Sequence, residues 1–363
     1  MFQLTRHEGG PILTPDKNYS WENEGVFNPG VIKVGEEVIM LYRAVGERDS
    51  YISHIGLAKS HDGISFTRAG VEPVFGPSEV FDTWATEDPR ITQIGSDFYV
   101  TYVAVPERIM DHGRGIDRPI ALETSTALLK TQDFVSFENL GVISPLHSDN
   151  KDIVLFPKKL RRVNKETGEA EGLARYAILH RPNRWSKDWF QGSYGKTVDV
   201  PLPCAMEDIP TIPSIWISWS DDLKNWTDHQ PFMRPSHHSD AKIGPGLPPI
   251  ETEKGWLLIY HHVEMTEIEN SFRYSTRVAL LDLDDPTHII AKLPYEILAP
   301  EMPYEIEQQS KIVFPTGGYV SDGTLYVYYG ASDRYVCMAS GSLNELLDEL
   351  QKHATVNSTN VSV

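Results

Sequence analysis

A β-hairpin recurs five times along this chain and limits the folds that the chain can adopt. Each copy combines a proline, a short apolar strand, a turn with glycine or charged residues, and a second strand rich in Tyr, Trp, Ile, Leu and Val. Alternation of this kind, with a period of two residues, is typical of paired strands. The copies begin at Asn28, Asp88, Phe156, Pro248 and Phe314. The sequence therefore predicts an all-β protein built from repeats.

A second recurring element lies between the hairpins, at residues 59–70, 130–141 and 218–229, with a weaker copy at 281–294. In the three clearer copies a Ser or Thr precedes an Asp, and an aromatic residue follows the turn, so the carboxylate is suited to bind turn amides. A hairpin and an outer turn make a four-stranded blade, and five blades predict a five-bladed β-propeller. A β-sandwich with five unrelated hairpins is the alternative. The innermost strands are expected at about residues 29–34, 90–94, 153–157, 247–251 and 312–318.

The chain length is compatible with one large domain or with two ordinary ones, because all-β folds of this kind run long. Five similar hairpins favour one propeller domain over residues 1–363, with segments 1–25 and 342–363 at its periphery. Within the second segment, leucines spaced three and four residues apart predict a short C-terminal helix at 342–353.

The charge of the chain excludes two classes of partner. Its formal net charge is −18, whereas nucleic acids and anionic membranes both require a basic surface. No stretch of 18 apolar residues occurs, and the N-terminus lacks an apolar signal segment, so a cytoplasmic protein is expected. Cys204 and Cys337 are too few for a disulfide framework. The sequence leaves open whether the chain forms a homo-oligomer.

Unusual polar residues stand at the ends of the hairpin strands. In a propeller the innermost strands line the central channel, so these residues would meet at one mouth of it. Charged side chains do not normally cap core strands, and a shared pocket explains them best. The residues are Arg43, Glu87, Asp88, Arg90, Lys151, Asp152, His180, Arg181, Lys242, Tyr260, His261, His262 and Asp333.

Six separated segments, in order, resemble glycoside hydrolase family 130 over about residues Asn28 to Leu350. They are "TEDPR", "NKDIVLFPKK", "YAILHRP", "PSIWISWSDDLKNW", "KIGPGLPPIETEKGWLLIYHHV" and "VFPTGGYVSDGTLYVYYGASD". The family comprises five-bladed propellers, most of them β-mannoside phosphorylases and some of them β-mannosidases. The loops at 105–119 and 183–210 are longer than the family pattern and are expected near the pocket mouth.

The resemblance implies an inverting β-mannoside phosphorylase in which Asp88 is the general acid. The proton of Asp88 would pass through a mannose hydroxyl to the glycosidic oxygen, while phosphate attacks the opposite face and gives α-mannose 1-phosphate. One carboxylate suffices because phosphate is already an anionic nucleophile. We expect the neighbouring charge of Glu87 to raise the pKa of Asp88. The alternative reading of Asp88 is a turn cap before Pro89.

Phosphate binding requires cations, and arginine suits bidentate contacts with phosphate. The residues predicted to bind phosphate are Arg118, His180, Arg181 and Lys242. Each alone would more often be a surface charge, but their clustering at hairpin ends favours a site. The residues predicted to bind the sugar substrate are Arg43, Glu87, Arg90, Lys151, Asp152, Tyr260, His261 and Asp333, and Trp84, Tyr102 and Tyr260 are candidates for stacking on a sugar ring.

The expected partners are a β-mannosyl oligosaccharide and inorganic phosphate as co-substrate, without a cofactor. No metal is expected, because the histidines lack a paired ligand spacing. A β-mannosidase is one alternative and would need a second carboxylate, for which Glu207, Asp208 and Glu264 are candidates. A non-catalytic carbohydrate-binding propeller is the other alternative. The sequence does not decide the linkage or the acceptor sugar.

Overall fold

The computed structural model describes residues 1–106, 108–109, 120–121, 124–145, 148–163, 167, 169–185, 210–235 and 239–354. Arg118, Glu207 and Asp208 lie outside the described residues, as does most of each lengthened loop. Among the described residues, no helix has the length and apolar character needed to cross a membrane.

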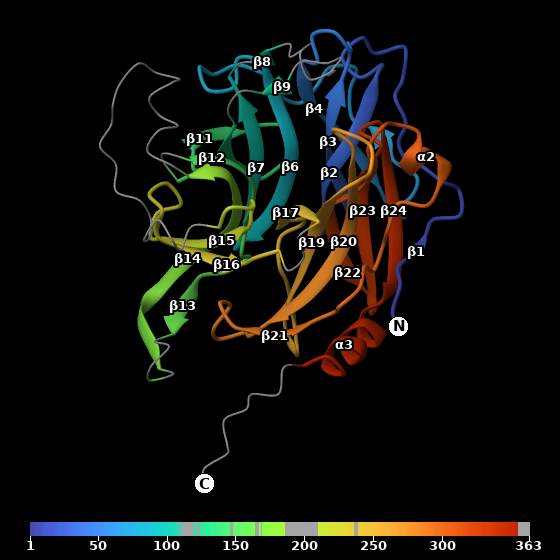
Figure 1. The fold of residues 1–363 in the computed structure, drawn as a ribbon. Helices are drawn as coiled ribbons and strands as arrows, with labels where there is room; N and C mark the ends of the chain where they lie inside the picture. Colours follow the sequence, from blue (N-terminus) through green and yellow to red (C-terminus); the bar gives the residue numbers. More distant parts are fainter. Residues whose placement is uncertain are drawn as a thin grey trace.

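The described chain is nearly all β, which confirms the predicted class (Figure 1). By their antiparallel pairing most strands fall into five sets, and short parallel pairings also join the first set to the second and the fourth to the fifth. Set 1 contains β2 (Gly25–Val34), β3 (Glu37–Val45), β4 (Ser53–Ser60) and β5 (Thr67–Arg68). Set 2 contains β6 (Ala85–Ile94), β7 (Asp97–Val105), β10 (Ser125–Thr131) and β11 (Glu138–Val142). Set 3 contains β12 (Ser148–Leu155), β14 (Ala170–Trp185), β15 (Ile215–Ser220) and β16 (Thr227–Met233), with β13 (Leu160–Val163) also paired to β14.

The remaining sets follow the same order. Set 4 contains β17 (Asp240–Pro245), β19 (Gly255–Met265), β20 (Phe272–Leu281) and β21 (Ile289–Lys292), with β18 (Ile250–Thr252) also paired to β19. Set 5 contains β22 (Lys311–Ser321), β23 (Thr324–Ala331), β24 (Tyr335–Ser342) and the N-terminal strand β1 (Thr5–Arg6). A separate pair joins β8 (Arg108–Ile109) to β9 (Ile120–Ala121), and the described helices are α2 (Pro303–Ile306) and α3 (Leu343–Gln351).

The fourth inner strand differs from its prediction. We expected it near 247–251, but β17 ends at Pro245, and only the short β18 pairs further along β19. Pro248 and Pro249 lie between the two strands and have no N–H to donate to a sheet. The interruption therefore follows from the proline pair.

Five apolar clusters hold the sets together, and each cluster joins two consecutive sets. Residues of sets 1 and 2 form one cluster, and further clusters join sets 2 to 3, 3 to 4 and 4 to 5. The fifth cluster packs Val26 and Met40 of set 1 against Tyr328 and Met338 of set 5. The chain thus buries most of its core between sheets, and its last set packs on its first.

The first strand of set 1, β2, approaches the first strands of sets 2 and 5 at backbone distance. A Cβ atom at Gly30 of β2 would lie 2.8 Å from the carbonyl oxygen of Pro89 in β6. On the other side of β2, a Cβ atom at Gly317 of β22 would lie 2.6 Å from the carbonyl oxygen of Pro29. Both distances are too short for any side chain, so glycine is required where these inner strands meet.

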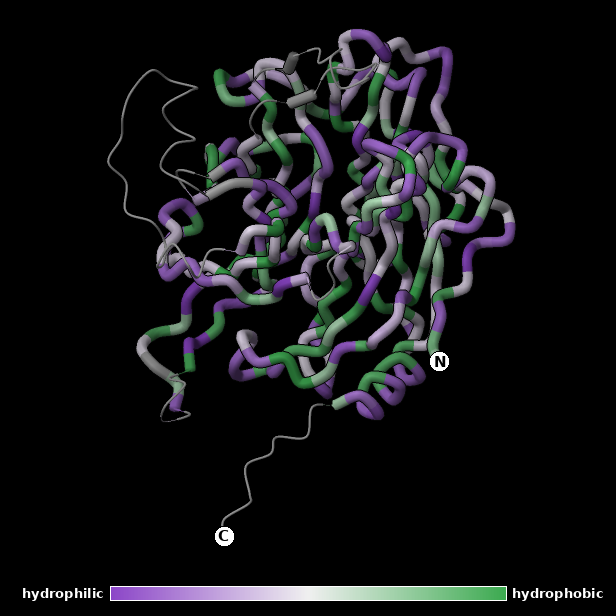
Figure 2. Tube along the Cα trace, in the orientation of Figure 1, coloured by the Kyte–Doolittle hydropathy of each residue, from purple (hydrophilic) through white to green (hydrophobic). Residues whose placement is uncertain are grey.

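The N-terminal and C-terminal segments both pack on set 5, as Figure 1 shows for β1 and α3. Strand β1 pairs with β24, and Arg6 Nε lies 2.8 Å from the buried Glu305 Oε1. Helix α3 lies within the predicted range 342–353, and its apolar and polar residues segregate (Figure 2). Its buried residues Leu346, Leu347 and Leu350 join the cluster between sets 4 and 5.

A β-bulge interrupts the inner strand of the first three sets at the same place. In each, two residues of the inner strand stand opposite one residue of the next strand, and the first of the two has a positive φ angle. These residues are Asn28 (φ 47°), Asp88 (φ 50°) and Asp152 (φ 60°). Asn and Asp adopt this conformation more readily than other non-glycine residues. Bulges re-aim side chains, and these three supply much of the polar cluster described below.

Candidate active site

Asp88 lies buried at the bulge of β6, within reach of donors from three other strands. Its Oδ1 atom accepts a hydrogen bond from Asn28 Nδ2 at 2.8 Å and another from Arg43 Nη1 at 3.1 Å. Its Oδ2 atom lies 3.9 Å from Lys151 Nζ. Strands β2, β3 and β12 therefore all contribute a side chain to this carboxylate.

The pKa of Asp88 is lowered, contrary to our expectation. Burial raises the pKa, but the charges of Arg43, Lys151 and Arg90 outweigh burial and hold the pKa below its ordinary value. Glu87 was expected to act in the opposite direction. However, Arg43 Nη2 donates to Glu87 Oε1 at 2.7 Å, so a cation lies between the two carboxylates.

Asp152 forms a second buried acidic centre on β12. Its Oδ2 atom accepts a hydrogen bond from Arg181 Nε at 2.8 Å and forms an ion pair with Arg181 Nη2 at the same distance, and its Oδ1 atom accepts a hydrogen bond from Arg90 Nη2 at 3.3 Å. Burial raises the pKa of Asp152, but Arg181 and Arg90 hold it far below its ordinary value. Asp152 is therefore an ionised anchor that fixes two arginines.

His261 lies beside this anchor on β19 and is fully buried. Its Nε2 atom is 3.6 Å from Asp152 Oδ2, and neither ring nitrogen has a hydrogen-bond partner among the described residues. Burial lowers the pKa of His261, and the charges of Arg181 and Lys242 lower it further. The ring is therefore neutral near pH 7. Buried polar atoms are nearly always satisfied in folded proteins, so the two nitrogens suit a bound ligand.

Lys242 of β17 supplies another cation close to His261. Its Nζ atom lies 5.3 Å from the ring centre of Tyr274 and 5.8 Å from that of Phe272. These are cation–π distances. Within the part of the chain that the structure describes, no carboxylate lies within ion-pair distance of Lys242.

The cluster has more cations than carboxylates. Arg43, Arg90, Lys151, Arg181 and Lys242 surround Glu87, Asp88 and Asp152, although the whole chain carries a formal net charge of −18. The three arginines are buried and the two lysines are partly buried. An excess of cations in one cluster of an acidic protein favours binding of an anion. Arg181 has five N–H donors, and its contacts with described residues engage three of them, on Asp152 and Asn183. The others are suited to an oxyanion.

His180 does not join this cluster, although we predicted that it binds phosphate. Adjacent residues of a strand point to opposite faces, so His180 faces away from Arg181. Its Nδ1 atom lies 2.9 Å from Asn150 Nδ2, and its Nε2 atom lies 2.7 Å from Ser218 Oγ. Burial lowers its pKa well below the ordinary value. His180 is therefore a neutral residue whose two nitrogens are already engaged.

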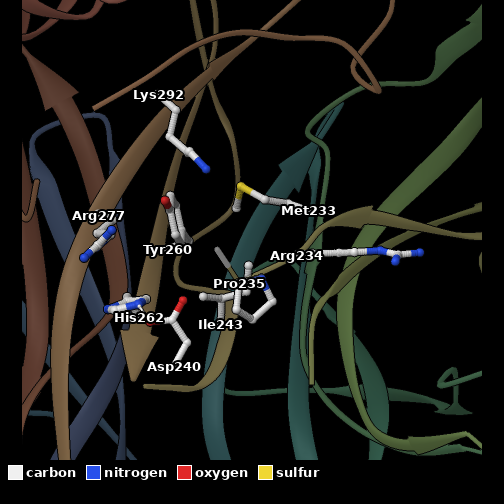
Figure 3. Close-up of a pocket in the computed structure, with 9 residues that line it drawn as sticks. All are labelled: Met233, Arg234, Pro235, Asp240, Ile243, Tyr260, His262, Arg277 and Lys292. Atoms are coloured by element: carbon white, nitrogen blue, oxygen red, sulfur yellow. Dashed lines mark hydrogen bonds and ion pairs between the residues drawn. The ribbon is translucent and has the colours of Figure 1, made fainter. Parts of the chain in front are cut away.

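Tyr260 is also placed away from the cluster, on the face of β19 opposite His261. It is buried in the apolar cluster between sets 3 and 4. Figure 3 shows Tyr260 with His262, Arg277 and Lys292 around a separate small pocket. The predicted contact of Tyr260 with sugar is therefore not supported by its position.

Of the other two aromatic residues predicted to stack on sugar, one lies in the core and one does not. Tyr102 is buried in the core between sets 1 and 2, where its hydroxyl donates to Asp82 Oδ2 at 2.8 Å. It is a core residue and not a sugar platform. Trp84 directly precedes β6 and is only partly buried. Its Nε1 atom donates to the carbonyl oxygen of Ser50 at 2.9 Å. Trp84 therefore remains a candidate for stacking.

Asp333 lies in the turn between β23 and β24, with a φ angle of 48°. Its carbonyl oxygen would be 3.0 Å from a Cβ atom at Gly25, the first residue of β2. Gly25 pairs with Val45, two residues beyond Arg43 on β3. Asp333 thus lies at the same end of the inner strands as Asp88, where it is partly buried.

Asn28 is the contact of Asp88 that the sequence analysis missed. It is buried, and its side chain lies against Gly330, where a Cβ atom would be 1.9 Å from Asn28 Oδ1. The signal was present in the repeat, because "NPG" begins the first hairpin as "DPR" begins the second. Aligning the hairpins residue by residue would have identified Asn28 as the counterpart of Asp88.

One set of described residues has ligand types that a metal ion could use. Ligand atoms of Asp240, His262 and Glu264 lie within 4.8 Å of one another. However, His262 Nε2 is already 2.7 Å from Asp240 Oδ1, and Glu264 Oε2 is 3.0 Å from Arg273 Nη1. Each of the three side chains is therefore already engaged by a neighbour, although His262 Nδ1 has no hydrogen-bond partner among the described residues.

Comparisons with known proteins bear on this cluster. A family model described as beta-1,4-mannooligosaccharide phosphorylase matches residues 7–166 and 209–352. The 1,2-beta-oligomannan phosphorylase of Thermoanaerobacter sp. (strain X514) is 33% identical over 347 residues, which is 93% of this chain and 97% of that protein. The Beta-1,2-mannobiose phosphorylase of the same organism is 32% identical, over 93% and 97% respectively.

A solved structure supports the same relationship. The Beta-1,2-Mannobiose phosphorylase from Listeria innocua, in complex with beta-1,2-mannobiose, aligns with a TM-score of 0.73 and 27% identity. The alignment covers 96% of this chain and 99% of the other. The similarity therefore extends over all five strand sets.

Proposed function

This chain belongs to glycoside hydrolase family 130, and we propose that it is an inverting β-mannoside phosphorylase. Its reaction converts a β-mannosyl sugar and inorganic phosphate into α-mannose 1-phosphate and the released sugar. The observation that carries the proposal is the excess of cations around Asp88 and Asp152 in a strongly acidic protein. A hydrolase would need no such anion site.

In the proposed mechanism Asp88 supplies the proton of the leaving group. The proton passes through a mannose hydroxyl to the glycosidic oxygen, which leaves with the electron pair of the bond to the anomeric carbon. An oxygen of phosphate attacks that carbon from the opposite face and inverts its configuration. No metal or organic cofactor takes part in the proposed reaction.

The proposed phosphate ligands are Arg181, Lys242, Lys151 and His261. Asp152 holds the guanidinium of Arg181 through two bonds of 2.8 Å, so this donor is oriented before phosphate arrives. Neutral His261 is able to donate one hydrogen bond from its ring. Arg118 stays a proposed ligand from the sequence alone.

Sugar binding is proposed at the other side of Asp88. Arg43 fixes Glu87 and Asp88 through bonds of 2.7 and 3.1 Å, and both carboxylates can accept from mannose hydroxyls. Asp333, at the same strand ends, is a further proposed acceptor, and Trp84 is a proposed stacking surface. Arg90 is proposed to act indirectly, since it bonds Asp152 and the carbonyl oxygen of Gly246.

We further propose that the five strand sets are the blades of a five-bladed β-propeller with one central site. Support comes from the five apolar clusters, which link each set to the next and the fifth to the first. The pairing of β1 with β24 supports the same arrangement, because it joins the start of the chain to its last set.

A β-1,2-linked mannoside is the proposed substrate. The two relatives and the solved structure described above are all named for β-1,2-linked mannosides, although the family description names β-1,4-linked ones. A cytoplasmic location is proposed from the chemistry, because a sugar phosphate made inside the cell does not cross its membrane.

The mannosidase alternative gains no support from the described residues. It needs a second carboxylate that activates water. Glu264, one candidate, forms an ion pair of 3.0 Å with Arg273 on the neighbouring strand β20. Glu207 and Asp208 lie outside the described residues.

The linkage is tested in the synthetic direction, because phosphorolysis is reversible. We expect the protein to join α-mannose 1-phosphate to mannose, to release phosphate, and to form a β-1,2 linkage that NMR identifies. A β-1,4 product would contradict the proposed linkage alone. Failure to release phosphate with any mannosyl acceptor would contradict the phosphorylase reaction.

A further inference from the structure

The two oxygen atoms of the Asp88 carboxylate have different surroundings. Oδ1 accepts two hydrogen bonds, from Asn28 at 2.8 Å and from Arg43 at 3.1 Å. Oδ2 has a cation at the longer distance of 3.9 Å, the ammonium group of Lys151. If Asp88 carries a proton, Oδ2 is therefore the atom that can hold it.

Lys151 lies between the acid and the proposed phosphate ligands. It pairs with Arg181 across β12 and β14, and it precedes Asp152 in sequence. Its side chain is 21% exposed, whereas those of Asp88 and Arg181 are each 3% exposed. A lysine carries a compact charge on a flexible stem, so this cation is able to change partners.

In the free protein Asp88 is held as a carboxylate, whereas a general acid must carry a proton. The charges of Arg43, Lys151 and Arg90 keep the pKa of Asp88 low despite its burial. A general acid must hold a proton when the sugar reacts. Some event before the reaction therefore has to weaken the cationic field at Oδ2.

We propose that Lys151 couples phosphate binding to protonation of Asp88. In the free protein its ammonium group neutralises Oδ2, and a phosphate bound at Arg181 draws that group away, so that Oδ2 takes up a proton from solvent. The inference rests on the proposed phosphorylase reaction and explains how phosphate binding leads to protonation of the general acid, Asp88. Lys151 thereby acts as a positioning residue for the proton as well as a phosphate ligand.

The protons of this cycle balance. One proton enters from solvent at Asp88 when phosphate binds, and it leaves on the oxygen of the released sugar. An unprotonated oxygen of hydrogen phosphate attacks the anomeric carbon, and the mannose 1-phosphate that forms releases its remaining acidic proton to solvent. Asp88 ends as a carboxylate, and Lys151 returns to it when the product leaves.

Other titratable or charged groups face the same site. Glu87 and Arg43 contact each other, Arg90 bonds the Asp88 carbonyl oxygen at 2.8 Å, and Asp152 is held by Arg181. Besides Asp88, His261 can also gain a proton when an anion binds, because its ring is neutral in the free protein. The test must therefore separate His261 from Asp88.

The test counts protons taken up when an anion binds to the full chain without sugar. The probe is sulfate, which resembles phosphate but has no proton that titrates near neutral pH. Calorimetry in buffers of different ionisation enthalpy gives the number of protons bound per sulfate. We expect an uptake of about one proton at a pH near 6.5, in a range where an unperturbed aspartate takes up none.

Four variants identify the group that takes up the proton and the lysine on which the uptake depends. Uptake should disappear in Asp88→Asn and persist in His261→Gln. Lys151→Met and Lys242→Met should each weaken sulfate binding by about tenfold, but only Lys151→Met should also reduce proton uptake. Lys242 is the matched control because it is a cation of the same cluster beside His261 and, among the described residues, does not contact Asp88.

Four results would overturn the inference. Three of them are sulfate binding without proton uptake, uptake that depends on His261 and not on Asp88, and equal uptake in the two lysine variants. The fourth is absence of sulfate binding, because the anion must bind before the sugar reacts. None of these results would affect phosphate-dependent product formation, which tests the proposed function separately.

Discussion

Replacing Asp88 with asparagine should lower kcat for phosphorolysis by roughly 10²- to 10⁴-fold, the usual contribution of general acid catalysis. Asparagine keeps the size of the side chain and can still accept the bonds from Asn28 and Arg43. It also tolerates the φ angle of 50° at this position. The melting temperature of Asp88→Asn should therefore stay close to that of the unchanged protein. Steady-state kinetics and a thermal melt measure both effects.

A second substrate separates acid catalysis from a structural role of Asp88. An aryl β-mannoside with a strongly acidic phenol as leaving group needs little protonation, so Asp88→Asn should lose much less activity on it. Equal losses on both substrates would indicate damage to binding instead. Turnover of the natural type of substrate close to the unchanged rate would show that Asp88 is not the acid and would direct attention to Glu87.

Replacing Arg181 with alanine should raise the KM for phosphate by about tenfold or more. One charge-assisted contact with an anion contributes about 1.5 to 3 kcal/mol, which corresponds to roughly 10- to 150-fold in affinity. The KM for the mannoside should change little, because Arg181 contacts Asp152 and Asn183 on the side of the cluster assigned to phosphate. Initial rates over a grid of both substrate concentrations measure the two values.

Arg175→Ala is the matched control for this prediction. Arg175 lies on the same strand, β14, but forms ion pairs with Asp221 and Asp228 near the surface. The Arg175→Ala variant should leave both KM values unchanged.

The Arg181→Ala variant should also melt at a lower temperature, because Asp152 loses its two contacts with Arg181. Parallel increases in both KM values would contradict a specific role of Arg181 in phosphate binding.

The all-β class and most strands were predictable from sequence because their signals are local. Alternation within each hairpin and the Asp-containing outer turns identify the strands. In all three of the clearer turns the aspartate, Asp62, Asp133 or Asp222, accepts the expected backbone bonds. The fourth inner strand was placed wrongly because the proline pair Pro248 and Pro249 marks an interruption and not a strand start.

The site was only partly predictable, because two adjacent residues in the second strand of each hairpin point to opposite faces of the sheet. At the first of these positions the side chain points away from the inner cluster. Tyr42, Tyr102 and Tyr329 occupy it, and the hydroxyl of each donates to a buried carboxylate. His180 and Tyr260 occupy the same position. The next residue pairs with the inner strand, and it is Arg43, Val103, Arg181, His261 and Gly330 in the five sets.

Aligning the five hairpins at these two positions would have shown, without a structure, that His180 and Arg181 point to opposite faces, as do Tyr260 and His261. The lowered pKa of Asp88 could not have been found in this way. It depends on Arg43 and Lys151, which belong to other strand sets and approach Asp88 only when the sets pack together. Distances between strand sets, rather than residue types, decide the charge state of a buried group.

The proposed reaction transfers a mannosyl group to phosphate, and NMR of β-1,2-mannobiose incubated with the protein, with and without inorganic phosphate, tests it directly. We expect equal amounts of α-mannose 1-phosphate and mannose, formed only when phosphate is present. Release of mannose alone, at a rate that does not depend on phosphate, would contradict it.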